Sequence, residues 1–304
     1  MRRGWLTTSL AVPVLASAAL TPWALRVAFA QAPPPASETQ EDNIPADDLP
    51  STDPAPSDAA TPEPAGGTAL DGGAPGRDGM IRVPGATFTM GSSDSKSPPN
   101  ERPRHVETVA PFWIDRTEVT VLAYRSCVDS HACVRPAKSS ASCTYDLGDP
   151  RLPVSCVHWR DAEAFCRDLG KRLPREAEWE LAGRGARSGR WPWLGGSAGC
   201  YFASTLVSET TARTCTRGPS RVGAHAAGAS PLGIQDLSGN VEEWTSDWYV
   251  ENLAVGGGAA SGAAHVLRGG GWLSTPSASR VTSRNWGSAI EAGPNVGFRC
   301  AKDG

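Results

Sequence analysis

The stretch "HWRDAEAFCRDLGKRLPREAEWELAG" (158–183) contains the strongest helix signals in the sequence. Its first half places apolar residues at the i, i+3, i+4 and i+7 spacing of an amphipathic helix: Ala162, Phe165, Cys166 and Leu169. Gly170 stands where a C-terminal cap belongs. The second half predicts a further short helix that ends at Gly183.

Helix signals become sparse on both sides of this stretch. Glycine, proline and tryptophan dominate residues 183–304 and predict irregular loops around short strands such as "HVLRGGGW" (265–272). Before it, "MIRVPGATFTMGSS" (80–93) alternates apolar and polar residues around Pro84-Gly85 and predicts a β-hairpin. Thr120 predicts the N-cap of a short helix. The sequence therefore indicates an α+β fold with few regular elements.

Residues 1–30 have the pattern of a signal peptide. Arg2 and Arg3 precede an apolar run over 6–25, and "AFA" (28–30) fits a cleavage site. The alternative is an uncleaved membrane anchor, but prolines interrupt the apolar run. Sec and twin-arginine export both fit the pattern. We expect an exported protein, periplasmic or extracellular, with no membrane span in its mature chain.

Residues 31–78 are rich in proline, alanine and acidic side chains. They contain ten acidic residues, one arginine and almost no large apolar side chains. Such a composition buries too little surface to offset chain entropy, so a disordered linker is expected. One folded domain then occupies 79–304.

The domain is close to neutral. Its 21 arginines and 4 lysines oppose 22 acidic residues, and no basic run accompanies them, so nucleic acid is not an expected partner. All eight cysteines lie in the domain, and none forms a C-x-x-C pair. Behind an export signal an even count predicts disulfides. Cys200 and Cys215, neighbours within one loop, are one expected bridge; spacing alone leaves the rest open.

Seven motifs occur together over residues 79–302: "GMIRVPGATFTMGS", "RTEVTVLAYRSCV", "PVSCVHWRDAEAFCRDLGKRLPREAEWELAGRG", "WPW", "GIQDLSGNVEEWTSDWY", "RGGGW" and "NVGFRC". In this order they resemble the formylglycine-generating enzyme family, also called sulfatase-modifying factors. The resemblance implies a disulfide-stabilised, loop-rich variant of the C-type-lectin-like fold. It also implies a disulfide between Cys166 and Cys300.

The resemblance implies an oxidase that converts a cysteine of an exported sulfatase to formylglycine, using oxygen and copper(I) held by two thiolates. Here Gly271 stands at the family's serine, and Ser274 and Ser279 stand at its two cysteines. Copper(I) is a soft ion that prefers thiolates, and a serine hydroxyl stays protonated at neutral pH. We therefore expect neither copper nor formylglycine-generating activity.

Other positions are candidates for binding. Asn295, in "NVGFRC", matches a position at or near the family's cleft. Tryptophans offer large amphipathic surfaces, and paired arginines can grip a carboxylate or phosphate. The candidates are Trp244, Trp272, Arg280, Arg284 and Trp286. The alternatives are core packing for each tryptophan and a solvated face for the arginines.

"SGNVEEW" (238–244) matches a calcium site of the family. Asn240 offers an amide oxygen, Glu243 a carboxylate and Val241 a backbone carbonyl, and calcium binds such oxygens. The resemblance thus implies a structural calcium ion. The alternative is a Gly-Asn turn before a strand.

Two functions remain open. The first is a binding module or an accessory or maturation module. Its expected partner is an exported protein or peptide, or a small polar ligand. The second is an oxidoreductase of the same family, of the formylglycine-generating or siderophore-maturation type.

Overall fold

A computed structural model of the chain describes residues 79–137, 140–185, 187, 189–195, 198–256 and 259–304. The predicted signal peptide (1–30) and linker (31–78) lie outside these residues. The strands are β1 (Met80–Val83), β2 (Ala86–Met90), β3 (His105–Val109), β4 (Phe112–Asp115), β5 (Glu242–Trp248), β6 (His265–Arg268), β7 (Arg284–Gly287), β8 (Val296–Gly297) and β9 (Ala301–Asp303). The α-helices are α1 (Val121–Asp129), α2 (Trp159–Asp168), α3 (Glu176–Arg184) and α4 (Leu253–Gly256).

The N-terminal strands form one bent antiparallel ribbon. β1 pairs with β4 and β2 pairs with β3, and the pairing register is the same on both sides of Pro84-Gly85. The hairpin predicted within 80–93 is therefore wrong, because β1 and β2 do not pair with each other. Proline has no N–H and interrupts the ladder, and here it bends a strand instead of reversing it. β9 then adds to the free edge of β4.

The second large sheet has the order β7-β6-β5-β8. β6 lies between β5 and β7, antiparallel to both, and β8 joins β5 in parallel. The strand predicted within 265–272 is confirmed over 265–268. It ends where Gly269 and Gly270 adopt φ values of +87° and +61°, a left-handed backbone that favours glycine.

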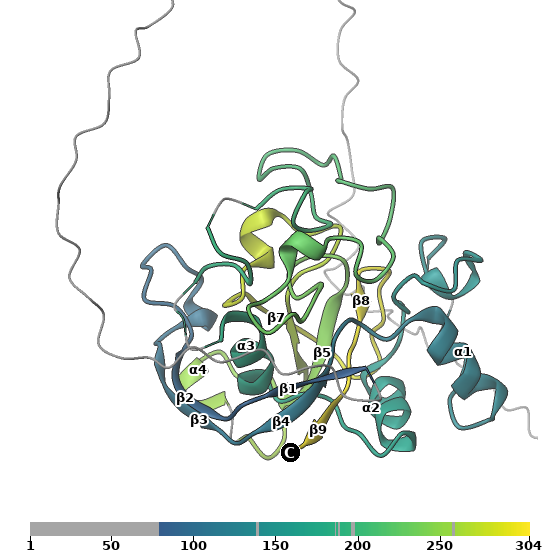
Figure 1. Ribbon diagram of the computed structural model, residues 1–304, viewed down its shortest axis with the longest axis horizontal. Helices are drawn as coiled ribbons and strands as arrows, with labels where there is room; N and C mark the ends of the chain where they lie inside the picture. The colour runs from purple at the N-terminus through teal and green to yellow at the C-terminus, as the bar shows by residue number, and fades with distance from the viewer. Residues whose placement is uncertain (1–78, 138–139, 186, 188, 196–197, 257–258) are drawn as a thin grey trace, which may run out of the picture. The chain divides into compact units, whose positions relative to one another are not determined.

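The three predicted helices are all present. α1 begins at Thr120, whose Oγ1 accepts a hydrogen bond from Ala123 N (3.2 Å). α2 and α3 divide the stretch 158–183 as its spacing predicts. Figure 1 shows α3 between the bent ribbon and the four-stranded sheet, and α3 contacts strands of both. Trp179 on α3 is fully buried and donates from Nε1 to Glu243 (2.8 Å).

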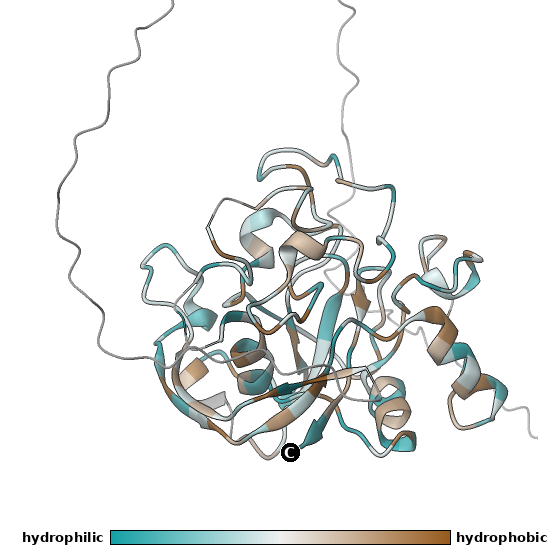
Figure 2. Cartoon of the chain, viewed as in Figure 1, coloured by the Kyte–Doolittle hydropathy of each residue, from teal (hydrophilic) through white to brown (hydrophobic). Residues whose placement is uncertain are grey.

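Two apolar clusters hold these layers together. One joins the ribbon to α3, and the other lies among α1, α2 and the second sheet, with Tyr124 stacked on Phe165 at 5.5 Å between ring centroids. Figure 2 shows short hydrophobic stretches interspersed with hydrophilic ones. Among the described residues, none of the helices has the length and apolarity needed to cross a membrane.

All eight cysteines lie in the described part of the chain and form four disulfides: Cys127–Cys133, Cys143–Cys156, Cys166–Cys300 and Cys200–Cys215. The last two are the expected bridges. Cys166–Cys300 ties α2 to the residue before β9 across 134 positions of sequence. Four disulfides are compatible with an exported protein, because such bonds persist in oxidising compartments.

Candidate functional site

The loop after β6 brings two predicted site residues together. A 3₁₀-helix (Pro276–Ser279) turns the loop back toward Gly270, and Thr275 caps it. A Cβ placed on Gly270 would lie 2.7 Å from Ser279 Oγ and 3.1 Å from Ser274 Cβ. The two serines therefore converge on the same glycine, although they are five positions apart in sequence. We call residues 270–279 the serine loop.

The hydroxyl groups of Ser274 and Ser279 form hydrogen bonds within the loop, whereas Ser277 Oγ donates to Glu209 (2.7 Å) outside it. Ser274 Oγ accepts a hydrogen bond from Gly271 N (3.0 Å), and the buried Ser279 donates to the Thr275 carbonyl (3.1 Å). Asn295 closes the loop from the other side by accepting from Leu273 N (3.0 Å). Such an arrangement fixes the loop but places no base against Ser274 or Ser279.

A histidine partner for these serines is also missing. His265 is buried between Trp159 and Trp248, at ring-centroid distances of 3.7 and 3.9 Å. Burial lowers its pKa to about 4, so the ring is neutral at pH 7. Within the described residues, no histidine is hydrogen-bonded to Ser274 or Ser279. Activation of either serine by a neighbouring base therefore has no support.

The disulfides bear on copper directly. All eight cysteines are described, and each one is disulfide-bonded, so none is a free thiol. A copper(I) ion held by two thiolates consequently has no ligands in this arrangement, at the serine loop or elsewhere. The residues present do not fit the metal that the family resemblance implies.

The two arginines of the predicted binding surface are structural. Arg280 forms a bidentate pair with Glu101 (2.7 and 2.7 Å), and Arg284 forms one with Glu176 (2.6 and 2.9 Å). All four side chains are buried. This corrects the expectation of a solvated or ligand-gripping face, because buried carboxylates already occupy both guanidinium groups.

The tryptophans divide into core and surface residues. Trp244 is fully buried and donates to the Val157 carbonyl (2.9 Å), so it packs the core and does not line a groove. Trp272, within the serine loop, is largely buried and donates to the Pro294 carbonyl (3.2 Å). Trp286, by contrast, is 53% exposed on β7.

The predicted calcium ligands are engaged with protein groups. Asn240 adopts a left-handed backbone conformation, accepts from Ser220 N (2.8 Å) and donates to Glu118 (3.0 Å). Glu243 pairs with Arg299 through both oxygens (2.6 and 2.7 Å). These side chains consequently do not fit a calcium ion in this geometry. Val241, whose carbonyl was the third expected ligand, is buried beside them.

Glu242 is a residue that sequence reasoning missed. Its side chain is buried, and burial raises its pKa to about 7, while a hydrogen bond from Asn285 (3.1 Å) opposes the rise. Its backbone N–H donates to the Asn295 carbonyl (2.7 Å), which places it behind the serine loop. The doubled acid in "VEEW" was a visible signal, but only its second member was assigned.

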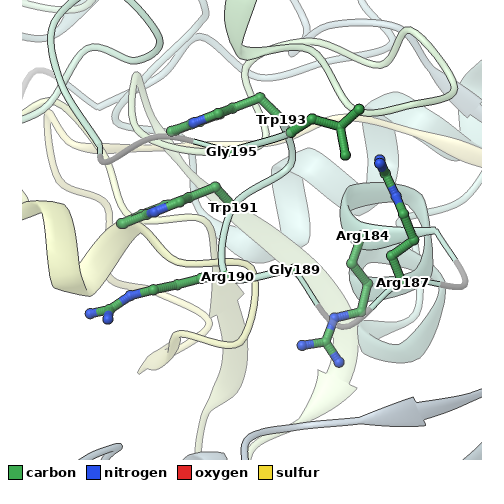
Figure 3. Close-up of a pocket in the computed structure, with 8 residues that line it drawn as sticks. Arg184, Arg187, Gly189, Arg190, Trp191, Trp193 and Gly195 are labelled. Carbon is green, nitrogen blue, oxygen red and sulfur yellow. The ribbon is translucent and has the colours of Figure 1, made fainter. Parts of the chain in front are cut away.

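A pocket beside the serine loop was missed as well. It has a volume of about 400 Å³ and is lined by Arg184, Arg187, Gly189, Arg190, Trp191, Trp193, Leu194 and Gly195. Figure 3 shows the side chains of Arg190, Trp191 and Trp193 layered on one side and extending away from Arg184 and Arg187, which lie on the other side. Val281 N donates to the Arg190 carbonyl (3.2 Å), which joins the pocket wall to the segment after the serine loop. We call it the arginine–tryptophan pocket.

The four-disulfide, loop-rich α+β fold and its Gly-rich strand define a C-type-lectin-like domain of the formylglycine-generating enzyme type. Residues 72–304 match the family model described as the sulfatase-modifying factor enzyme 1-like domain. The chain belongs to this family, and the resemblance found in the sequence is confirmed.

Individual relatives agree with this assignment. The chain is 31% identical to a formylglycine-generating enzyme of Streptomyces coelicolor, over 74% of this chain and 89% of that protein. It is 30% identical to the inactive C-alpha-formylglycine-generating enzyme 2 of Bos taurus, over 73% and 87% of the two chains. Among solved structures, PvdO from Pseudomonas aeruginosa matches with a TM-score of 0.63 and 27% identity, covering 74% of this chain and 94% of PvdO.

Proposed function

We propose that this protein is an exported binding or accessory module of the family and does not generate formylglycine. The convergence of Ser274 and Ser279 on Gly270 supports this most directly, because the loop keeps two facing side chains but presents hydroxyls where thiolates are required. The pairing of every cysteine in a disulfide leaves no substitute.

A binding role suits the groups that the surrounding segment presents to solvent. Leu273, within the otherwise polar and partly buried serine loop, is 45% exposed, and Trp286 beyond the loop is 53% exposed. Aromatic and small polar side chains together form contact surfaces that combine area with adaptable hydrogen bonding. The proposed partner is an exported protein or peptide, or a small polar ligand. The similarity to a relative whose name includes the word "inactive" is consistent with this role.

Copper(I) titration of the full chain, coupled to oxidation of a cysteine-containing sulfatase peptide, tests the proposal. The wild-type protein should show no stoichiometric copper(I) binding and no aldehyde product. The double variant Ser274→Cys/Ser279→Cys should gain stoichiometric binding, because the two positions already face the same glycine. The single variant Ser274→Cys is the matched control and should bind at least tenfold more weakly, since it supplies one thiolate.

Tight one-to-one copper(I) binding by the wild-type chain, together with aldehyde formation, would overturn the proposal. That result would favour the alternative, an oxidoreductase of the same family that uses ligands other than thiolates at the serine loop.

A further inference from the structure

The arginine–tryptophan pocket has a positively charged lining. Arg184, Arg187 and Arg190 contribute guanidinium groups, and none of the described residues that line the pocket is acidic. Its volume of about 400 Å³ lies within the range of small-ligand sites. A neighbouring hollow shares Arg184, Gly189 and Arg190 and adds Arg104 and one acid, Asp94.

Two buried donors in the pocket wall have no partner. Arg184 Nε and Trp193 Nε1 have no hydrogen-bond partner among the described residues, and both residues are only 6% exposed. Most buried polar groups in proteins are hydrogen-bonded, and a buried donor without an acceptor destabilises the fold. Both groups are N–H donors, so the partner that they lack is an acceptor.

The buried ion pairs behind the pocket leave an excess of positive charge. Arg184 pairs with Glu180, which also pairs with Arg268, and Glu176 pairs with both Arg268 and Arg284. Three arginines thus share two carboxylates, which is a formal excess of one positive charge. Arg184 stands at the pocket end of this chain of ion pairs.

The outer arginines add to this charge. In the described part of the chain, neither Arg187 nor Arg190 forms an ion pair, and Glu209 interacts electrostatically with Arg190 without reaching ion-pair distance. Arg190 lies over the Trp191 ring at 5.7 Å, and Trp191 stacks on Trp193 at 5.4 Å with the ring planes 3° apart. The stacking holds the Arg190 guanidinium in place beside the pocket.

We propose that the arginine–tryptophan pocket binds a small ligand through an oxyanion group: a carboxylate, sulfate or phosphate. Arg184 Nε on one side of the pocket donates to the oxyanion group, Trp193 Nε1 on the other side donates to a second acceptor of the same ligand, and Arg187 and Arg190 supply positive charge. Guanidinium groups match the planar geometry of such anions. The pocket exceeds the size of a bare anion, so the group is carried on a larger molecule such as an acidic sugar. This site is independent of the chemistry proposed for the serine loop.

The test is titration of the full chain with inorganic phosphate, sulfate, acetate and glucuronate at constant ionic strength, followed by tryptophan fluorescence and calorimetry. At least one anion should bind saturably, and glucuronate should bind more tightly than acetate because it fills more of the pocket. The double variant Arg187→Gln/Arg190→Gln should weaken binding at least tenfold, since both residues are exposed and loss of charge leaves the fold intact. Trp193→Phe keeps the ring stack, removes the N–H and should weaken binding severalfold.

Matched controls are Arg167→Gln on α2, whose side chain is 72% exposed, and Trp113→Phe on β4, which does not line the pocket. Both should bind as the wild type does. Absence of saturable binding for all four anions would overturn the proposal, as would equal weakening by Arg167→Gln. Equal affinity for acetate and glucuronate would overturn the larger ligand. None of these outcomes depends on copper(I), so failure here is distinguishable from failure of the proposed function.

Discussion

At the scale of single residues, the shape of the serine loop depends on the absence of a side chain at Gly271. A Cβ there would lie 2.6 Å from Asn295 Cγ, so a serine would displace the Asn295 amide and break its hydrogen bond to Leu273 N. We expect Gly271→Ser to lower the free energy of unfolding by about 1–2 kcal/mol. Urea denaturation monitored by tryptophan fluorescence measures the change.

Gly199→Ser is the control for this substitution, because a Cβ at Gly199 meets no atom within 4 Å. Asn295→Ala should reduce the effect of Gly271→Ser in the double variant by removing the overlapping amide. An undiminished loss in the double variant would show that Asn295 is not what excludes a side chain at position 271.

Glu242 makes stability depend on pH. Burial raises its pKa from 4.5 to about 7, so between these values the folded protein holds a proton that the unfolded chain has released. The contribution of Glu242 to the free energy of unfolding is therefore fully present below pH 4.5 and is lost as the pH rises through 7. Glu242→Gln removes this pH dependence. Between pH 4.5 and pH 8, the free energy of unfolding of the variant should therefore rise by roughly 3 kcal/mol relative to that of the wild type. Chemical denaturation across that range measures it.

Other buried groups titrate in the same interval, which decides the form of the comparison. Asp247 has a pKa raised to about 6, and His265 has one lowered to about 4, both chiefly by burial. They are present in both proteins, so the difference between wild type and variant isolates Glu242. The control is Glu163→Gln on α2, where the side chain is 43% exposed. This substitution should leave the pH profile of stability unchanged. A parallel profile for Glu242→Gln would contradict the assignment.

At the scale of elements, helices were predictable and strand partners were not. α2 is encoded by spacing within ten residues, and Thr120 caps α1 through its own side chain. The partner of β1, however, lies about thirty residues away, across η1 (Pro99–Glu101). Alternation identifies a strand but not the strand with which it pairs. The alternation over residues 80–93 therefore predicts a hairpin of β1 and β2 that does not form.

The same limit applies to the site. Motif order placed Gly271, Ser274 and Ser279 in one loop, and the structure brings the two serines together. Local sequence could not show that Glu101 and Glu176 meet Arg280 and Arg284, because these pairs are separated by 179 and 108 positions. The arginine–tryptophan pocket was missed for a related reason. Its arginines are spaced without a motif, and only the fold reveals that Arg184 and Trp193 lack partners.

At the scale of the whole molecule, one disulfide closes most of the domain. Cys166–Cys300 links residues 134 positions apart, whereas Cys127–Cys133 spans only 6. A cross-link restricts the unfolded chain more when its loop is longer. The fold has few regular elements, and much of the chain between α2 and β9 is irregular. The long bridge joins α2 directly to the sheet that contains β9.

Removal of the two bridges should therefore have unequal effects. Cys166→Ala/Cys300→Ala should lower the free energy of unfolding by about 5 kcal/mol, and Cys127→Ala/Cys133→Ala by about 2 kcal/mol, on the chain-entropy relation. Cys166 and Cys300 are both fully buried in the apolar cluster, whereas Cys133 is only partly buried, so the long bridge also loses more packing and the difference should be at least about 3 kcal/mol. Guanidinium denaturation of the oxidised proteins measures both values. Equal losses of stability in the two double variants would contradict the prediction, because restriction of the unfolded chain would then not set the contribution of these bridges.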